Sequence, residues 1–129
     1  MVRKVETPHA YRSKSPLSQA VIENGFIFAS GMTAVDSSGA TVGTDITTQT
    51  RQVMENLRIV LEAGGSAMER VVRTTVFFLR REDYDAIDAV YKEYFPKVAP
   101  ARSAIIIAGL VRPELLVEID AIASIVSSS

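Results

Sequence analysis

The sequence has no cysteine and only one histidine, His9, among its 129 residues. Without thiols the chain can form neither a disulfide, nor a thiolate metal site, nor a cysteine nucleophile. One histidine is too few for a histidine metal centre or a Ser-His-Asp triad, and we expect His9 to lie at the surface of an irregular segment. Phosphate-binding and dinucleotide-binding glycine patterns are missing as well. We therefore expect neither a metal nor a cofactor.

An excess of either charge sign is also missing. The chain has 14 Lys and Arg against 15 Asp and Glu, a net charge of -1, and a pI near 5.8. This balance gives no overall attraction to nucleic acid. No apolar run approaches the roughly 18–20 residues of a membrane helix, and the N-terminus lacks the apolar core of a signal peptide. We expect a cytoplasmic protein without membrane or nucleic-acid partners.

What the chain does have is length for one domain and an apolar composition. Its 129 residues match the typical size of about 100–150 residues for one domain, so we expect a single domain over residues 1–129. Hydrophobic residues make up 47% and the mean hydropathy is +0.17. That is apolar for a soluble chain of this size, which favours an oligomer that covers part of its surface.

Turn residues organise the N-terminal third. Asn24-Gly25 stands between two apolar runs, and both residues tolerate positive φ, which is a strong signal for a β-hairpin with strands at 20–22 and 26–29. Residues 37–44 are rich in Ser, Gly and Thr and predict a turn followed by a short strand.

Two segments have helical periodicity. Apolar residues recur at helical spacing from 46 to 63, with Asp45 as the N-cap and Gly64-Gly65 as the end. A second helix is predicted to begin at an Asp83 cap and to stop before Pro96.

Three strands complete the expected elements. The β-branched and aromatic run 71–79 predicts a central strand buried on both faces, and strands at 101–107 and 116–125 follow. Ser127–Ser129 is expected to be a frayed tail. The result is an α+β fold with a mixed sheet, in which two helices cover one face and oligomerisation covers the other.

Arg102 and Glu118 are the polar residues that interrupt otherwise apolar strands. Such groups are costly unless they are paired, hydrogen-bonded or placed in a wet cleft. The two positions are symmetric about Leu110, so a simple hairpin would pair them as a structural ion pair. Alternatively, Arg102 binds a substrate carboxylate and Glu118, with a raised pKa, orients or activates water. The residues alone leave both interpretations open.

Several segments together resemble the signature of the Rid/YjgF family, the reactive-intermediate deaminases. They occur in the family's order, with matching gaps, over nearly the whole chain: Pro16–Ala20, Phe28–Met32, Arg73–Phe77, Pro100–Ala104 and Val117–Ala123. The resemblance implies a chorismate-mutase-like fold and a homotrimer with a central barrel, outer helices and ligand clefts between subunits. It also implies cofactor-free hydrolysis of enamines and imines to 2-keto acids and ammonia.

The resemblance also implies roles for individual residues. Arg102 resembles the arginine that binds the carboxylate of a 2-imino acid, and Glu118 the acid that positions the attacking water. Ser30 and Gly31 resemble the wall of the cleft. In that fold, strand 71–79 would lie between the strands of Arg102 and Glu118, which would exclude their direct pairing.

Some expected cleft positions depart from the family pattern. Leu17 stands where a tyrosine is usual, Ala104 where a cysteine is usual, and Asp88 where an asparagine is frequent. Loss of the phenol removes a hydrogen-bond partner, whereas Ala104 keeps the backbone carbonyl. Leu17 and Ile106 favour an apolar pocket for a larger or more apolar substrate.

Two alternatives to a deaminase remain. The first is a non-catalytic protein of the same fold with a ligand-binding or regulatory role, which would bind small carboxylates. Leu17 in place of the tyrosine favours this alternative, whereas the presence of both Arg102 and Glu118 argues against it. The second is an endoribonuclease or translation inhibitor, an activity attributed to some relatives. The acidic pI and the lack of a basic-aromatic stripe argue against it.

Overall fold

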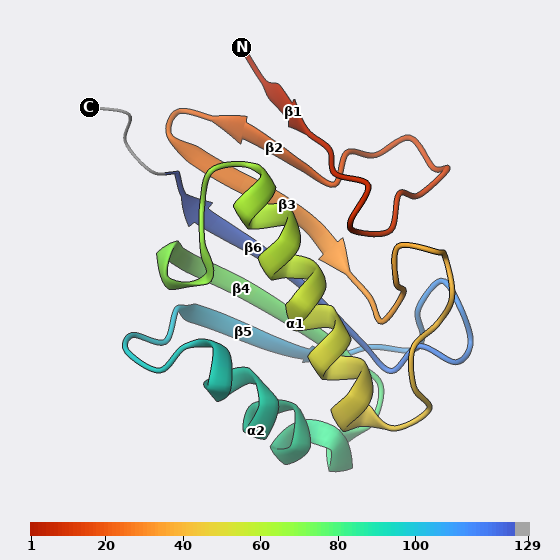
Figure 1. Cartoon of the computed structure of the whole chain (residues 1–129). Helices are drawn as coiled ribbons and strands as arrows, with labels where there is room; N and C mark the ends of the chain where they lie inside the picture. Colours follow the sequence, from red (N-terminus) through yellow and green to blue (C-terminus); the bar gives the residue numbers. More distant parts are fainter. Residues whose placement is uncertain (126–129) are drawn as a thin grey trace.

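The computed structural model describes residues 1–125, so the predicted Ser127–Ser129 tail lies outside the described residues. One six-stranded sheet, in the order β1-β2-β3-β6-β4-β5, carries two α-helices on one face (Figure 1). The expected α+β fold is confirmed. The elements are β1 (Arg3–Val5), β2 (Ala20–Glu23), β3 (Phe26–Met32), α1 (Ile46–Ala63), β4 (Val71–Phe78), α2 (Tyr84–Tyr94), β5 (Ala101–Ile106) and β6 (Val117–Ser124).

The predicted hairpin is present, and the chain before it is more ordered than expected. Asn24 and Gly25 both have positive φ, 52° and 79°, as a tight turn between β2 and β3 requires. Strand β1 was not predicted, and its extended backbone pairs with β2 and buries Val5. His9 lies in an exposed turn after this strand, as expected. Residues 37–44 contain no full strand, only an isolated bridge between Val35 and Thr41.

Helix α1 follows its predicted boundaries. The Asp45 carboxylate accepts a hydrogen bond from the Thr48 amide at 2.9 Å, and Gly65 supplies the positive φ, 84°, just beyond the helix end. Asp83 stands at the N-cap position of α2, as predicted, but its side chain does not cap the helix. Its carboxylate accepts from Arg80 Nε at 2.9 Å and does not bond the helix amides, because a short 3-10 turn, Arg81–Asp83, precedes the helix.

Strand β4 separates the last two strands. It pairs in parallel with β5 and antiparallel with β6. The prediction of a simple hairpin between β5 and β6 is therefore wrong. The arrangement implied by the family resemblance, with β4 between the strands of Arg102 and Glu118, is confirmed. The physical reason is α2, which lies between β4 and β5 in sequence and makes a crossover that returns the chain parallel to β4. β6 then pairs on the other side of β4.

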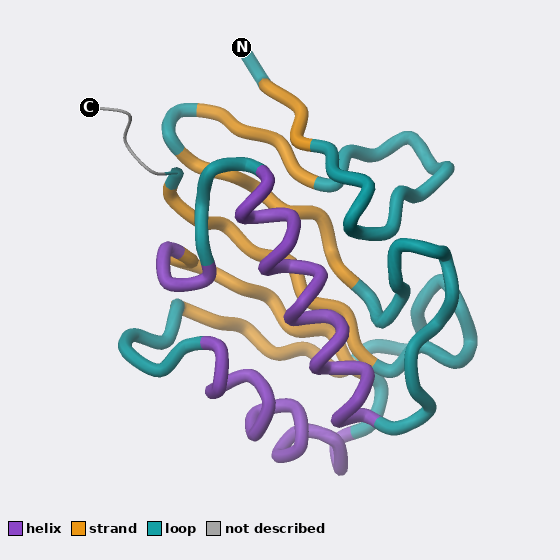
Figure 2. The backbone as a smooth tube through the Cα atoms, in the orientation of Figure 1, coloured by secondary structure: helices purple, strands orange, loops and turns teal. Residues whose placement is uncertain are grey.

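The two faces of the sheet differ in what covers them. Thr74, Val76 and Phe78 of β4 face the helices and are buried. Val72 of the same strand does not face the helices and is 46% exposed. The prediction that this strand is buried on both faces is thus wrong for the single chain, since both helices lie on one face (Figure 2). The open face exposes further apolar side chains, including Phe26, Phe28 and Ile105.

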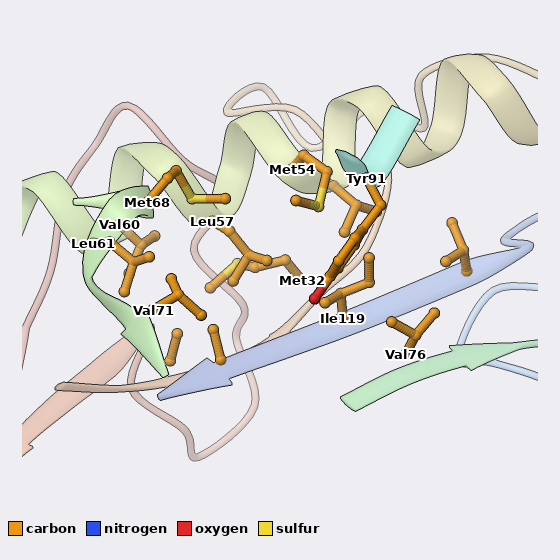
Figure 3. Close-up of a cluster of buried hydrophobic side chains, with 14 of the residues drawn as sticks. Met32, Met54, Leu57, Val60, Leu61, Met68, Val71, Val76, Tyr91 and Ile119 are labelled. Carbon is orange, nitrogen blue, oxygen red and sulfur yellow. The ribbon is translucent and has the colours of Figure 1, made fainter. Parts of the chain in front are cut away.

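The core lies between the helix face of the sheet and α1. Residues of α1 pack onto β6 and β3, and the buried side chains form a continuous layer (Figure 3). Fully buried members with under 1% exposure include Val53, Met54, Leu57, Val60, Leu61 and Ile119. Among residues 1–125, neither helix is long and apolar enough to cross a membrane.

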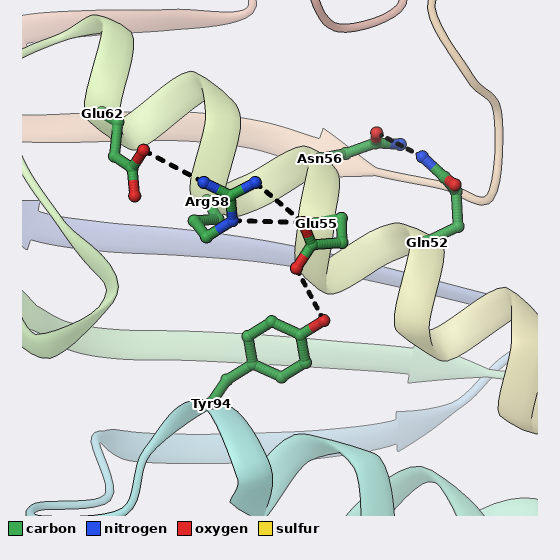
Figure 4. Close-up of polar contacts among 6 residues, drawn as sticks. All are labelled: Gln52, Glu55, Asn56, Arg58, Glu62 and Tyr94. Carbon is green, nitrogen blue, oxygen red and sulfur yellow. Dashed lines mark hydrogen bonds and ion pairs between the residues drawn. The ribbon is translucent and has the colours of Figure 1, made fainter.

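A polar cluster on the outer side of α1 holds α2 beside it (Figure 4). The Tyr94 hydroxyl donates to Glu55 at 2.8 Å, and Arg58 bridges Glu55 and Glu62. Burial, followed by the hydrogen bond and charge of Glu55, raises the pKa of Tyr94 to about 12. Within this cluster the Tyr94–Glu55 hydrogen bond joins α2 to α1, and Arg58 holds the Glu55 carboxylate in place.

Gln19 anchors the segment between β1 and β2. Its side-chain oxygen accepts from the Thr7 amide at 2.7 Å, and its amide nitrogen donates to the carbonyls of Thr7, Ala10 and Tyr11 at 3.1–3.2 Å. The side chain is 5% exposed, so each bond replaces water that cannot reach these groups. One side chain thus holds the main chain at Thr7, Ala10 and Tyr11.

We predict that Gln19→Ala lowers the free energy of unfolding by about 2–4 kcal/mol, because several buried main-chain groups lose their partner. Gln52→Ala is the matched control, since Gln52 makes a single side-chain bond, to Asn56, and should cost under about 1 kcal/mol. Urea denaturation measures both, and limited proteolysis should locate the new cleavage in segment 7–19. Equal stability of the two variants would contradict the anchoring role.

Candidate functional site

A cavity of about 370 Å³ opens at one end of the sheet. Loops of the chain gather at this end (Figure 2). Its walls come from segment 11–19, the end of β3 with the following loop, the loop before β6, helix α1 and β6 itself. The lining residues are Tyr11, Ser13, Ser15, Leu17, Gln19, Ser30, Gly31, Met32, Thr33, Val35, Asn56, Val111, Arg112 and Glu118.

Glu118 is the acid of this cavity. It lies opposite Phe77 on the open face of the sheet, where burial, followed by the negative charge of Asp120, raises its pKa. Within residues 1–125 no Lys or Arg forms an ion pair with it. A carboxyl group in such a position can exchange a proton closer to neutral pH than an ordinary glutamate.

Gly31 lets the backbone of β3 approach this carboxyl group. A Cβ atom at position 31 would lie 2.7 Å from Glu118 Cδ, closer than real contacts allow. The register of β3 against β6 shifts between Ala29 and Met32, so the close approach sits at a bulge. A larger residue at position 31 would therefore force the Glu118 side chain out of its present position.

Ser30 and Leu17 belong to the same cavity but differ in what they offer. The Ser30 hydroxyl donates to the Ser18 carbonyl at 2.6 Å, and the Ser30 amide donates to the Gln19 carbonyl at 3.0 Å. Ser30 therefore tethers the segment that carries Leu17. Leu17 itself is 53% exposed and presents hydrocarbon to the cavity.

An arginine at the rim was not predicted from the sequence. Arg112 donates to the Gly39 carbonyl at 3.1 Å and to Thr41 Oγ1 at 3.0 Å, and its guanidinium lies 5.6 Å from the centre of the Tyr11 ring. The loop that carries Arg112 has no periodic pattern from which its neighbours could be predicted. Its position beside Tyr11 is seen only in the structure.

Arg102 occupies a different place, on the helix face at the β5 edge. Its Nη1 donates to Asp88 at 2.7 Å, its Nη2 donates to the Tyr84 hydroxyl at 2.9 Å, and the Tyr91 ring centre lies 4.9 Å from its Cζ. Burial disfavours its charge, but the hydrogen bonds and charges of Asp88 and Tyr84 outweigh burial and raise its pKa. The arginine is fixed in orientation and permanently charged.

The partners of Arg102 share one side of α2. Tyr84, Asp88 and Tyr91 recur at the i, i+4, i+7 spacing of a single helix face. This spacing could have predicted that Tyr84, Asp88 and Tyr91 share one face of α2, but not that the face meets Arg102. Ala104 lies two residues along β5 and lines, with Tyr84 and Ile106, a neighbouring cavity of about 420 Å³.

One chain does not bring Arg102 and Glu118 together. Arg102 is opposite Thr74, which faces the helices, whereas Glu118 is opposite Phe77, which faces away from them. A structural ion pair between the two is excluded, and Arg102 pairs with Asp88 instead. The candidate residues fall into an acid half (Glu118, Ser30, Gly31, Leu17) and an arginine half (Arg102, Asp88, Ala104).

Neither half has the ligands of a metal centre. Across residues 1–125, no cluster of three or more His, Asp or Glu side chains could hold a metal ion. What the halves offer is proton exchange at Glu118 and anion recognition at Arg102.

Comparisons with known proteins match the whole fold. The family described as Endoribonuclease L-PSP matches residues 7–125. A RutC family protein from Synechocystis is 38% identical over 122 residues, covering 92% of this chain and 93% of its own. Structures of the Rid family protein YyfA from Yersinia pestis and of TdcF from E. coli with bound serine superpose with TM-scores of 0.93 and 0.89. Their identities are 34% and 28%, over 97% and 95% of this chain and 100% and 98% of theirs.

The match therefore extends through both halves of the candidate site, from segment 7–19 to β6. The chain belongs to the endoribonuclease L-PSP family, the family of the RutC and Rid proteins.

Proposed function

We propose that this protein is a hydrolytic deaminase of reactive enamines and imines, acting at clefts between the subunits of a homotrimer. The observation that carries the proposal is the division of the site. The acid half and the arginine half have complementary chemistry, yet they lie on opposite faces of one sheet. A cleft that joins the acid half of one subunit to the arginine half of the next would hold both.

The open face supports the assembly. Phe26, Phe28, Val72 and Ile105 are each at least 40% exposed on the side of the sheet without helices. Aromatic and branched apolar side chains gathered on one face are typical of surfaces that another subunit covers. Packing the open faces of three chains around an axis would bury them in a central barrel.

The chemistry follows from the two groups. Arg102 binds the carboxylate of a 2-imino acid, and Glu118 accepts a proton from water as the oxygen attacks the imine carbon. Glu118 returns this proton to nitrogen, which gives a carbinolamine. As the carbon-nitrogen bond breaks, the proton of the carbinolamine hydroxyl passes through Glu118 to the departing nitrogen, so that the hydroxyl becomes the carbonyl of a 2-keto acid and the nitrogen leaves as ammonia. Because its pKa is raised, Glu118 can serve as base and then acid near neutral pH. The bound serine in the TdcF structure supports a small ligand with a carboxylate for this family.

A non-catalytic carboxylate-binding protein is the second candidate. Leu17 favours it, because this side chain offers the cavity no hydrogen bond. Ammonia release from freshly generated 2-aminoacrylate separates the two. The endoribonuclease activity in the family's description finds less support, since the described lining of the acid half contains one arginine and no histidine.

We predict that the protein in solution has about three times the 14.0 kDa chain mass. Light scattering at micromolar concentration measures this. The reason is the exposed apolar face, which a monomer would leave in water. Phe28→Lys places a charge on that face and should yield monomers, whereas Val98→Lys changes an exposed residue outside it and should not. A monomeric wild type would rule out the intersubunit cleft.

We predict that Arg102→Ala folds and assembles but loses 2-keto acid binding. A charge-assisted contact with a carboxylate is expected to contribute on the order of 2–5 kcal/mol. The stability cost should stay below about 1 kcal/mol, because Asp88 remains 40% exposed and hydrated. Calorimetric titration with pyruvate measures the affinity, with Arg51→Ala on the outer side of α1 as control. Unchanged binding in Arg102→Ala would remove this residue from the site.

We predict that Glu118→Gln keeps 2-keto acid affinity and lowers turnover about 10²–10⁴-fold, because it cannot exchange a proton. Relative to wild type, its melting temperature should also rise as the pH increases above 4.5, the ordinary pKa of the group, and the difference should level off above the raised pKa of the folded state. The folded state holds the Glu118 proton more tightly than the unfolded state, so ionisation destabilises the wild type only. Glu62→Gln is the control. If Glu118→Gln hydrolyses every imine tested as fast as the wild type does, the catalytic role of Glu118 is refuted.

A further inference from the structure

The arginine half already contains a carboxylate. Asp88 Oδ1 lies 2.7 Å from Arg102 Nη1, in an ion pair whose side chains are 40% and 18% exposed. The other terminal nitrogen, Nη2, donates to the Tyr84 hydroxyl. Both outer nitrogens of the guanidinium are therefore engaged by α2 before any ligand arrives.

This arrangement changes what the arginine can offer a ligand. Arg102 and Asp88 together carry no net charge, so an approaching carboxylate meets a neutral pair. The ligand must displace Asp88 from Nη1 or bind beside a like charge. Hydrogen bonds between ionised groups are about twice as strong as those between neutral groups, so displacing Asp88 costs more than displacing an amide.

The surroundings give Asp88 no second cation. The groups that face Arg102 are the hydroxyl of Tyr84, the ring of Tyr91 and Asp88 itself, all from α2. Among residues 1–125, Arg102 is the basic residue that forms an ion pair with Asp88. Any ligand carboxylate therefore competes with Asp88 for one guanidinium.

We propose that Asp88 is a specificity-determining residue that competes with the ligand carboxylate for Arg102 and so weakens the binding of 2-keto and 2-imino monocarboxylates. The proposal rests on the proposed function, which assigns the ligand carboxylate to Arg102. Its consequence for the reaction is weak retention of the 2-keto acid product.

The test is calorimetric titration of the assembled protein with pyruvate and with 2-oxobutyrate. Asp88→Asn keeps the shape and the acceptor oxygen but removes the charge, and should lower Kd at least tenfold, which corresponds to about 1.4 kcal/mol. Glu93→Gln makes the same chemical change farther along α2, where the carboxylate pairs with Arg51, and should shift Kd less than twofold. Adding Arg102→Ala to Asp88→Asn should abolish the gain.

The outcomes are distinguishable. If wild type binds and Asp88→Asn binds no more tightly, the competition is refuted while the proposed function stands. If neither binds, Arg102 is not a carboxylate site and both proposals fail. Asp88→Ala, with a residue that favours helix, serves as the second variant should the amide disturb folding, and it should show the same gain. Unchanged affinity in both substituted proteins would overturn the inference.

Discussion

Two helices on one face of a six-stranded sheet leave the other face with aromatic and branched side chains in contact with water. This one-sided coverage governs the rest of the molecule. It makes the helix face the core of the chain, with α1 packed over β3 and β6. It also leaves Glu118, Asp120 and Phe77 on the face of the sheet that no helix of the same chain covers. The proposed subunit contact and the acid half both lie on this open face.

The central position of β4 explains why the chemistry is divided. A parallel crossover through α2 delivers β5 to one edge of β4, and β6 takes the other. Arg102 then points toward α2, which supplies three of its partners from one helix face. Glu118 points away and meets the bulge at Gly31. The same strand order that stabilises the sheet thus keeps the acid and the arginine of one chain apart.

Local signals in the sequence were enough for most elements. Asn24-Gly25, Asp45 and Gly65 act through their own backbone or nearest amides, so their roles could be predicted without knowing the fold. Strand order could not, because the symmetry of Arg102 and Glu118 about Leu110 also fits a hairpin. Only the resemblance to the Rid/YjgF family placed β4 between them. Arg112 and the Asp88–Arg102 pair needed the structure, since both join residues from distant elements.

The anchoring of segment 7–19 has a consequence for how such a pocket can diversify. Gln19 and Ser30 hold this segment almost entirely through its main-chain amides and carbonyls. Main-chain groups are the same whatever the side chains are, so the attachment survives substitution at positions such as Leu17. Over evolutionary time the scaffold can keep its shape while the wall of the pocket is exchanged one side chain at a time.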